Sequence, residues 1–312
     1  MEFKHVSVLL KESVDLLCVQ PGGIYVDGTL GGGGHSELIL NKLDSGGRLI
    51  GIDRDITAVK AASARLKAFD EKFVAVHDNF RNIKSILENL NVPKIDGAIL
   101  DLGVSSPQLD DANRGFSYNK DARLDMRMNR EDALTAFEVV NTYSEERLKT
   151  IIYRYGEERF AGAIARKICE ARSIKPIETT FQLSEIIKSA MPKKERLKDK
   201  HPAKKTFQAI RIEVNGELEL LKPAIDDFVS VLKPGGVLAV ITFHSLEDRI
   251  VKEEFLHLAK GCECPKDFPV CVCGKKPIIE LINKKPVVSG QKELSENYRA
   301  HSAKLRAARK LQ

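Results

Sequence analysis

The chain has 312 residues, which allow one large domain or two smaller ones. Its formal net charge is +6, and no apolar run approaches the roughly eighteen residues of a membrane helix, so we expect no membrane span. The stretch from Met1 to His5 lacks the apolar core of a signal peptide, so we expect a cytoplasmic location with reduced cysteines.

Positive charge is concentrated in two stretches. From Lys188 to Arg211, nine Lys and Arg residues stand against two acidic residues, and from Lys284 to the end eight stand against two. The rest of the chain is slightly acidic. Two basic patches on a nearly neutral body indicate a polyanionic partner such as nucleic acid. A pair of solvated charged helices is the alternative, and charge alone leaves both interpretations open.

The first predicted unit along the chain is a strand, a glycine turn and a helix. Residues 24–26 are apolar, four glycines follow from Gly31 to Gly34, and an apolar-periodic stretch begins at Ser36. This order is typical of the entry to a doubly wound α/β sheet, whose ligand lies beyond the carboxyl end of the strand. The glycines allow a ligand to approach closely, and the start of the helix offers N–H groups to an anion.

Asp27, at the end of the first strand, helps to decide which ligand binds at the glycine turn. A phosphate-binding P-loop is excluded because His35 and Ser36 follow Gly34, where that motif has Lys and then Ser or Thr. The dinucleotide pattern G-x-G-x-x-G fits only loosely. A carboxylate at Asp27 would repel a pyrophosphate, but it suits the ammonium or sulfonium group of S-adenosylmethionine. We therefore expect S-adenosylmethionine as the cofactor.

Further strands and helices alternate down to residue 101. Strands are predicted over residues 46–53, 73–80 and 95–101, and helices over 56–68 and 83–90, which indicates parallel βαβ units. Asp53 ends the second strand, where a carboxylate can accept both hydroxyls of an adenosine ribose. Phe80 closes the third strand and can stack on an adenine edge, although a core position is nearly as common for Phe.

The alternation stops between residues 113 and 215, where the pattern is helical and polar. Helices are predicted near residues 134–141, 144–155, 158–171 and 180–190. A helix over 217–231 and a strand over 237–243 then resume the α/β pattern. We expect one discontinuous sheet domain, residues 1–112 and 216–312, with a helical insertion of residues 113–215. Strands near 278–282 and 286–288 and a basic helix over 297–310 complete the prediction.

The stretch from Asp101 to Gln108 leaves the fourth strand, which lies beside the first strand in this architecture. Its small and polar residues and its proline loosely resemble the loop of enzymes that methylate exocyclic amino groups of bases. Asp101, Ser105 and Ser106 are the candidate catalytic residues, because an acceptor on the amino group favours the attacking geometry. The aromatic residue of such loops is missing here, and the candidates to replace it are Phe116, Tyr118 and Phe243.

In their joint order, the motifs of this chain resemble the bacterial small-subunit ribosomal RNA (cytosine-N4)-methyltransferases of the MraW/RsmH family. The matching stretches span nearly the whole sequence and lie at residues 5–10, 27–36, 51–55, 101–109, 114–118, 124–128, 155–160, 207–215, 243–249 and 297–302. The resemblance implies a class I, Rossmann-like S-adenosylmethionine-dependent methyltransferase sheet. It also implies that the helical insertion recognises the substrate.

The same resemblance implies an activity and a set of cofactor contacts. The activity is methyl transfer to the exocyclic N4 amino group of a cytidine in the decoding region of 16S rRNA. The implied contacts to S-adenosylmethionine are Gly33, Gly34, His35, Asp53, Phe80, Asp101 and Gln108. We interpret His35 as a neutral contact, because its place at a helix start disfavours the protonated form.

The residue types near the predicted cofactor agree with an amino group as the methyl acceptor. Methylation at cytosine C5 normally uses a covalent cysteine, and no cysteine lies in the loops after the first, fourth and fifth strands. Ribose methylation usually needs a lysine, and none lies in residues 101–114 or 241–248. His244 and Ser245 stand beside Asp248, but neighbours on one strand point to opposite faces, so a hydrolytic triad is not expected. We expect them to line the base pocket or to hold the neighbouring loop.

Four cysteines, Cys262, Cys264, Cys271 and Cys273, form two C-x-C pairs. Cysteines this close can bind zinc, but C-x-C pairs are less favourable than C-x-x-C pairs. We therefore expect a reduced, metal-free turn, with structural zinc as the alternative.

Two rival functions remain. A nicotinamide-dependent oxidoreductase is disfavoured by Asp27 and by the basic insertion. An RNA-binding ribosome assembly factor with a vestigial methyltransferase fold is disfavoured by the intact glycines and by Asp53 and Asp101. The sequence leaves the oligomeric state open, a homodimer included.

Overall fold

The computed structural model describes residues 7–197, 201–262, 264–265, 268–270 and 272–312. Contacts between Cα atoms divide the chain into two compact units: Met1–Gly103 with Leu218–Gln312 (unit 1), and Val104–Glu217 (unit 2). The division falls at Gly103 rather than at the expected residue 112. The reason is that Val104 and Leu109 pack against the apolar core of unit 2.

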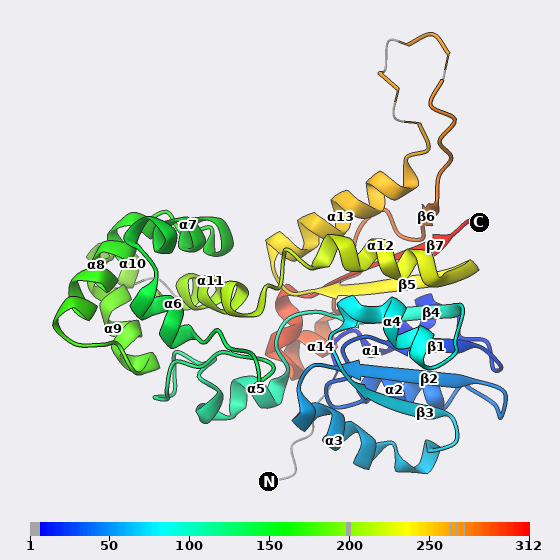
Figure 1. The fold of residues 1–312 in the computed structure, drawn as a ribbon, viewed down its shortest axis with the longest axis horizontal. Helices are drawn as coiled ribbons and strands as arrows, with labels where there is room; N and C mark the ends of the chain where they lie inside the picture. Colours follow the sequence, from blue (N-terminus) through cyan, green and yellow to red (C-terminus); the bar gives the residue numbers. More distant parts are fainter. Residues whose placement is uncertain (1–6, 198–200, 263, 266–267, 271) are drawn as a thin grey trace. The chain divides into compact units, whose positions relative to one another are not determined.

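Unit 1 contains a seven-stranded sheet in the order β3-β2-β1-β4-β5-β7-β6 (Figure 1). The strands are β1 (Ile24–Asp27), β2 (Arg48–Asp53), β3 (Phe73–His77), β4 (Ile95–Asp101), β5 (Leu232–Thr242), β6 (Ile279–Leu281) and β7 (Lys304–Lys310). The first five pair in parallel, and β7 runs antiparallel to both of its neighbours. The predicted α/β doubly wound sheet is confirmed. Its strand order reverses between β1 and β4, so a ligand crevice is expected beyond their carboxyl ends.

Helices cover both faces of this sheet (Figure 1). One face packs against α4 (Ile83–Asn89), α12 (Leu221–Val231) and α13 (Ser245–Ala259), and the other against α1 (Leu10–Leu17), α2 (Gly34–Leu40) and α3 (Ile56–Arg65). Neighbouring residues of one strand enter opposite cores: Val26 packs on the first side and Tyr25 on the second. Strands buried on both faces read as continuous apolar runs, which explains why β1, β2 and β4 were predictable.

The predicted basic helix over residues 297–310 is wrong. After α14 (Gln291–Glu296) and a short 3-10 turn over Tyr298–Ser302, residues Lys304–Lys310 form strand β7 between β5 and β6. Ala307 and Ala308 favour a helix by intrinsic propensity, but pairing with two strands overrides that weak preference. The strand predicted near 286–288 is also wrong, because Val287 forms only an isolated bridge with Leu305.

The positive charges of β7 are used inside unit 1. Lys304 and Arg306 both pair with Asp248, at 2.8 and 2.7 Å. Arg309 pairs with Glu280, and Lys310 donates to the backbone carbonyl oxygens of residues 229 and 230. Four of the eight basic residues of the C-terminal patch therefore make internal contacts, which reduces the value of the patch as a polyanion-binding surface.

Unit 2 is helical and has its own apolar core. Its helices are α5 (Ser106–Asp110), α6 (Ala136–Thr142), α7 (Glu145–Gly156), α8 (Ala161–Ile174), α9 (Thr180–Ser189), α10 (Lys193–Arg196) and α11 (Lys204–Asn215). The four helices predicted in this region are confirmed, and capping boxes at Thr135 and Thr179 explain where α6 and α9 begin. In the described part of the chain, no helix is both long and apolar enough to cross a bilayer.

Candidate functional site: the carboxyl edge of the sheet

The glycine run after β1 makes a tight turn into α2. Gly33 has φ +76°, a left-handed conformation that a residue with a side chain rarely adopts. A Cβ on Gly34 would lie 2.0 Å from the Ser7 Oγ atom, so a side chain there would push into the segment before α1. Gly33 and Gly34 therefore have structural reasons to be glycine, beside their predicted contact with a cofactor.

Asp27 is almost fully buried at the end of β1, with 1% of its surface exposed. Its Oδ2 atom accepts a hydrogen bond from the Ser36 hydroxyl at 2.7 Å, and its Oδ1 atom accepts one from the Thr29 N–H at 3.2 Å. Burial raises the pKa of this carboxyl to about 6, against the opposing effect of the Ser36 bond. A charge held here at neutral pH favours a cation in the neighbourhood.

Asp53 links the end of β2 to the glycine turn. Its Oδ2 atom accepts from the Gly31 N–H and its Oδ1 atom from the Asp55 N–H, both at 2.8 Å. Burial raises the pKa of Asp53, and the two N–H groups act in the opposite direction. Because each carboxylate oxygen has a second lone pair, Asp53 can hold the turn and still accept from two ribose hydroxyls. The bond to Gly31 was not foreseen from the sequence.

Asp101 ends β4, next to the end of β1. Its N–H donates to Thr29 Oγ1 at 2.5 Å, which ties the two strand ends together. Its Oδ1 atom is buried and has no hydrogen-bond partner among the described residues. The pKa of Asp101 lies well above the usual carboxyl range, chiefly because of burial and then because of the charges of Asp27 and Glu247. A buried acceptor without a partner is a place where a ligand donor is expected.

His35 lies behind the glycine turn, with 4% of its surface exposed. Its Nε2 atom is 3.2 Å from the Val8 carbonyl oxygen, and its Nδ1 atom is 3.8 Å from Asp101 Oδ2. An imidazole that donates from Nε2 to a carbonyl is satisfied in its neutral form. The His35 ring thus lies between the Val8 carbonyl and the Asp101 carboxyl. A direct contact of His35 with a cofactor stays a prediction.

His244 and Glu247 close the start of α13. His244 is the N-cap residue, its Nδ1 atom accepts from the Glu247 N–H, and Glu247 Oε2 accepts from the N–H groups of Phe243 and His244. This capping box supports the interpretation that His244 holds the neighbouring loop. Glu247 also adds a third carboxylate to the surroundings of Asp101.

The aromatic candidates occupy different environments. Phe80 is half-buried at the start of a 3-10 turn after β3, and Phe243 is half-buried at the end of β5, beside Gly103. Phe116 belongs to the apolar core of unit 2. Tyr118 stacks on His201 with ring centroids 4.4 Å apart. Among the three stacking candidates, Phe243 is the one that belongs to unit 1, where it follows β5 at the carboxyl edge of the sheet.

Ser105, Ser106 and Gln108 belong to unit 2. Ser105 caps α5, with the Gln108 N–H donating to its Oγ atom, and the Gln108 side-chain oxygen accepts from the Ser105 N–H. Ser-Ser-Pro-Gln fits the S-x-x-Q capping signature, so the start of α5 has a signal in the sequence itself. The catalytic and cofactor-binding roles expected of these residues stay predictions.

The basic stretch of unit 2 exposes cations without local partners. Lys193, Lys194 and Lys204 are exposed, and none of them forms an ion pair within the described ranges. Lys205 instead donates to the Glu157 carbonyl oxygen at 2.8 Å, and Arg211 pairs with Glu217. Only part of this stretch is therefore available for a polyanion.

Comparisons with known proteins agree along the whole chain. A sequence profile of the MraW methylase family matches residues 2–311. The ribosomal RNA small subunit methyltransferase H of Clostridium botulinum (strain Kyoto / Type A2) is 58% identical over 311 residues, covering 100% of both chains. The protein of the same name from Lachnospira eligens is 56% identical over 306 residues, covering 98% of this chain and 97% of the relative. A solved rRNA methylase from Streptococcus thermophilus aligns at 12% identity and a TM-score of 0.44, over 98% of this chain and 99% of that one.

Proposed function

This chain belongs to the MraW methylase family and is an S-adenosylmethionine-dependent methyltransferase, and we propose that it methylates the N4 amino group of a cytidine in 16S rRNA. The proposal places the target in the decoding region, as the family resemblance implies, and the reaction in the cytoplasm. The single observation that carries the choice of acceptor is Asp101 Oδ1, a buried acceptor without a partner among the described residues.

The carboxyl edge of unit 1 suits a cationic methyl donor. Asp27, Asp53, Asp101 and Glu247 influence one another's charge there, and burial raises the pKa of the first three. The donor supplies an electrophilic methyl group on a positively charged sulfur. A positive charge beside these carboxyls favours their ionised forms, so donor binding and carboxylate ionisation support each other. Ionised carboxylates at this edge repel a pyrophosphate, which disfavours a nicotinamide dinucleotide.

Asp101 is the residue that we assign to the acceptor. The amino nitrogen of cytosine is a weak nucleophile because its lone pair is delocalised into the ring. A carboxylate that accepts one amino hydrogen orients the group toward the methyl donor and can receive the proton that leaves. The Thr29 hydroxyl, bonded to the Asp101 N–H, holds the backbone of this residue in place.

We assign different protein side chains to the target base and to the phosphate backbone of the RNA. Phe243, half-buried at the end of β5, offers a ring on which an extruded base can stack. Lys193, Lys194 and Lys204 of unit 2 offer positive charge to the phosphates. Ser105, Ser106 and Gln108 follow Asp101 in sequence, and we retain them as candidates for contacts to base and donor.

Methyl incorporation tests the proposal. Purified full-length protein is incubated with labelled S-adenosylmethionine and with small subunits, free 16S rRNA or large subunits. We expect label in 16S rRNA material and none in large subunits, with no competition from excess NAD. Binding to small subunits without any methyl transfer would contradict the proposal and favour an assembly factor with a vestigial fold.

A further inference from the structure

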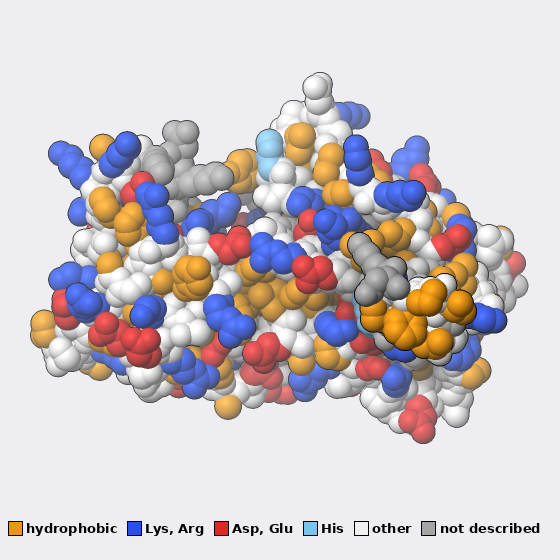
Figure 2. Space-filling model, turned by 90° about the horizontal axis from the view of Figure 1, so that it is seen from above, with side chains coloured by type: hydrophobic (Ala, Val, Ile, Leu, Met, Phe, Trp, Pro, Cys, Tyr) orange, Lys and Arg blue, Asp and Glu red, His pale blue; other side chains and the backbone are white. Residues whose placement is uncertain are grey.

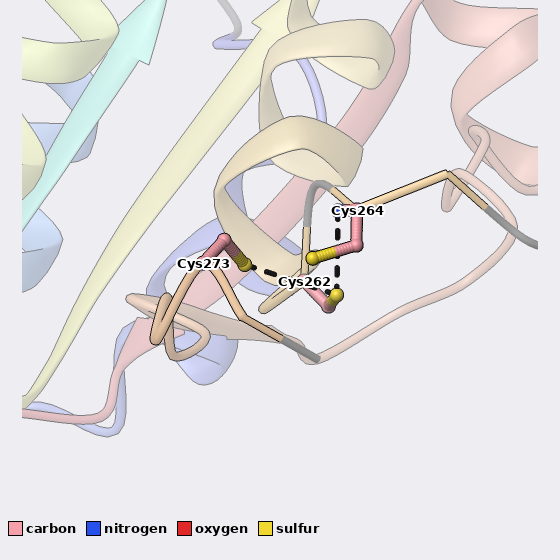
Figure 3. A group of neighbouring side chains, drawn as sticks. All are labelled: Cys262, Cys264 and Cys273. Carbon is pink, nitrogen blue, oxygen red and sulfur yellow. Dashed lines mark hydrogen bonds between the residues drawn. The ribbon is translucent and has the colours of Figure 1, made fainter. Parts of the chain in front are cut away.

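Three cysteines of unit 1 converge beyond the end of α13. The Sγ atoms of Cys262, Cys264 and Cys273 all lie within 4.8 Å of one another. Figure 3 shows the three side chains pointing toward one another. The sequence favoured a metal-free turn here, but because the sulfurs converge we propose that these thiolates bind a soft, tetrahedrally coordinated metal ion, with Zn²⁺ as the expected occupant. Cys271, the remaining cysteine of the predicted group, lies outside the described residues.

The sulfur positions match the dimensions of a zinc–thiolate site. Sulfurs about 2.3 Å from a tetrahedral zinc ion lie about 3.8 Å apart. The Cys262 and Cys273 sulfurs are 3.8 Å apart, although ten residues separate them in the sequence. The Cys264 N–H donates to Cys262 Sγ at 3.4 Å (Figure 3), and such a bond favours the charged thiolate that a metal requires. Three of four tetrahedral positions are thereby supplied, and water or another side chain completes the set.

The described residues of the surrounding loop have neither secondary structure nor an apolar core to order them. The chain between α13 and β6 extends away from the sheet, and its described residues form no helix or strand (Figure 1). Its apolar side chains do not build a core: Phe268, Val270 and Val272 are 52%, 70% and 73% exposed. Figure 2 looks onto this loop from above and shows hydrophobic side chains crowded on its outer surface. Long loops without secondary structure are uncommon in compact domains and are usually functional or disordered. A bound metal would order this one.

The two ends of this loop, near Gly261 and Pro277, already lie close together and form the neck of the loop. The Ile278 N–H donates to the Leu258 carbonyl oxygen at 2.9 Å. A Cβ on Gly261 would lie 2.6 Å from Pro277 Cδ, so only glycine allows this close approach. Cys262 follows Gly261 directly, and Cys273 lies four residues before Pro277. A metal at this point would close the loop just beyond its neck, where it restricts the most chain.

The cysteine cluster lies far from the carboxyl edge of the sheet. Helix α13 begins at that edge, directly after β5, and has 15 residues, so its two ends are about 22 Å apart. The cysteines follow its far end. The metal is thus structural, and its presence does not depend on whether the proposed methyl transfer is correct.

Metal content of the full-length protein tests the inference. The protein is purified without a metal-affinity step, and zinc and iron are measured by mass spectrometry of the elements. We expect about one metal ion per chain, and loss of it in Cys262→Ser, Cys264→Ser and Cys273→Ser. Cys18→Ser and Cys169→Ser, which change cysteines outside the cluster, serve as matched controls and should keep the metal. Binding of S-adenosylmethionine should persist in all five variants and shows that they are folded.

Two further readouts separate a metal site from a reactive cysteine pair. Reconstitution with Co²⁺ should give a thiolate-to-cobalt absorption band that each cluster variant loses. Trypsin should cut after Lys275 only after chelation or in the variants; the bond after Lys276 precedes Pro277 and resists trypsin in every state. Reduced wild-type protein that binds neither Zn²⁺ nor Co²⁺ would overturn the proposal. So would a purified chain two hydrogens lighter than its reduced mass, if peptide mass spectrometry places the disulfide between two cysteines of the cluster.

Discussion

The carboxyl edge of unit 1 and the basic stretch of unit 2 are electrostatic opposites. The first gathers buried carboxyls, among them Asp27 and Asp101, whose pKa values burial raises. The second exposes Lys193, Lys194 and Lys204, which have no ion-pair partners among the described residues. Buried acids suit a small cationic ligand, whereas exposed and mobile cations suit a polyanion. Under the proposed function, the donor binds at the carboxyl edge of unit 1 and the RNA phosphates bind unit 2, and each of the following predictions tests one of these two assignments.

The largest effect is expected at Asp101. In Asp101→Asn the side chain keeps its size but loses its charge, so kcat should fall about 100-fold or more. Single-turnover methylation assays measure the effect. Asp96→Asn is the matched control, because it removes a carboxylate at the other end of β4, where Asp96 pairs with Lys233. A kcat within threefold of the wild-type value would remove Asp101 from the reaction.

Donor affinity is expected to depend on Asp53. Asp53→Asn keeps an acceptor for the Gly31 or the Asp55 N–H, so the glycine turn should survive better than in Asp53→Ala. Loss of charged hydrogen bonds to a ribose should weaken donor binding by roughly 2–4 kcal/mol. Calorimetry measures the affinity, and a thermal unfolding curve checks the fold. Unchanged affinity in folded protein would exclude Asp53 from the donor site.

The exposed lysines of unit 2 should affect RNA alone. Changing Lys193, Lys194 and Lys204 to Ala should raise the RNA concentration needed for activity and lower the slope of log K against log salt by about two to three. A control variant changes Lys149, Lys167 and Lys175, which are exposed but paired with glutamates three residues away. Donor affinity should stay constant in both. An unchanged salt slope would mean that the stretch is only a solvated surface.

The smallest effect is a pH dependence that Asp27 contributes to donor binding. With its pKa raised to about 6, this carboxyl is partly protonated in the free protein below neutrality. A bound cation favours the ionised form, so binding releases protons and donor affinity should rise as pH increases to about 6, then level off. Calorimetry at pH 5, 6 and 7 measures this trend. The trend should be smaller in Asp27→Asn, where only the other carboxyls of this edge still contribute, and a wild-type trend of opposite sign would contradict a cation beside Asp27.

The stability of the free protein should vary with pH in the opposite direction. Between the ordinary carboxyl range and about pH 6, the native state keeps a proton at Asp27 that the unfolded chain has lost. Stability from this group is therefore greatest at low pH and falls as pH rises through that window. Comparing Asp27→Asn with the wild type by denaturant unfolding at pH 4.5 and 7 isolates the contribution.

Most strands of the sheet could be predicted from the sequence, because each has one strong local signal. Strands β1, β2 and β4 are apolar runs that end in Asp, and the glycine turn between β1 and α2 has no common alternative. Strand β7 was missed because Ala-rich, basic sequence carries a helical preference. Its true partners, Asp248 and Glu280, lie far away in the chain, and no local pattern contains them.

The positions of the site residues in the fold could be predicted from the sequence, but their hydrogen-bond partners could not. The positions of Asp53 and Asp101 at strand ends follow from the apolar runs that precede them. Their bonds to Gly31 and Thr29 depend on how neighbouring loops close over the sheet, which a one-dimensional pattern does not encode. Gln108 shows the reverse case, because its capping partner Ser105 is only three residues away and was readable from the sequence.

The central claim is the identity of the methylated atom, and nucleoside mass spectrometry tests it most directly. Small-subunit rRNA lacking the modification is treated with pure enzyme and S-adenosylmethionine, digested to nucleosides and compared with standards. The account predicts N4-methylcytidine as the product in the wild-type reaction and a strong loss of it with Asp101→Asn. Finding only 5-methylcytidine or a ribose-methylated nucleoside would contradict the assignment of an amino group to the acceptor at Asp101.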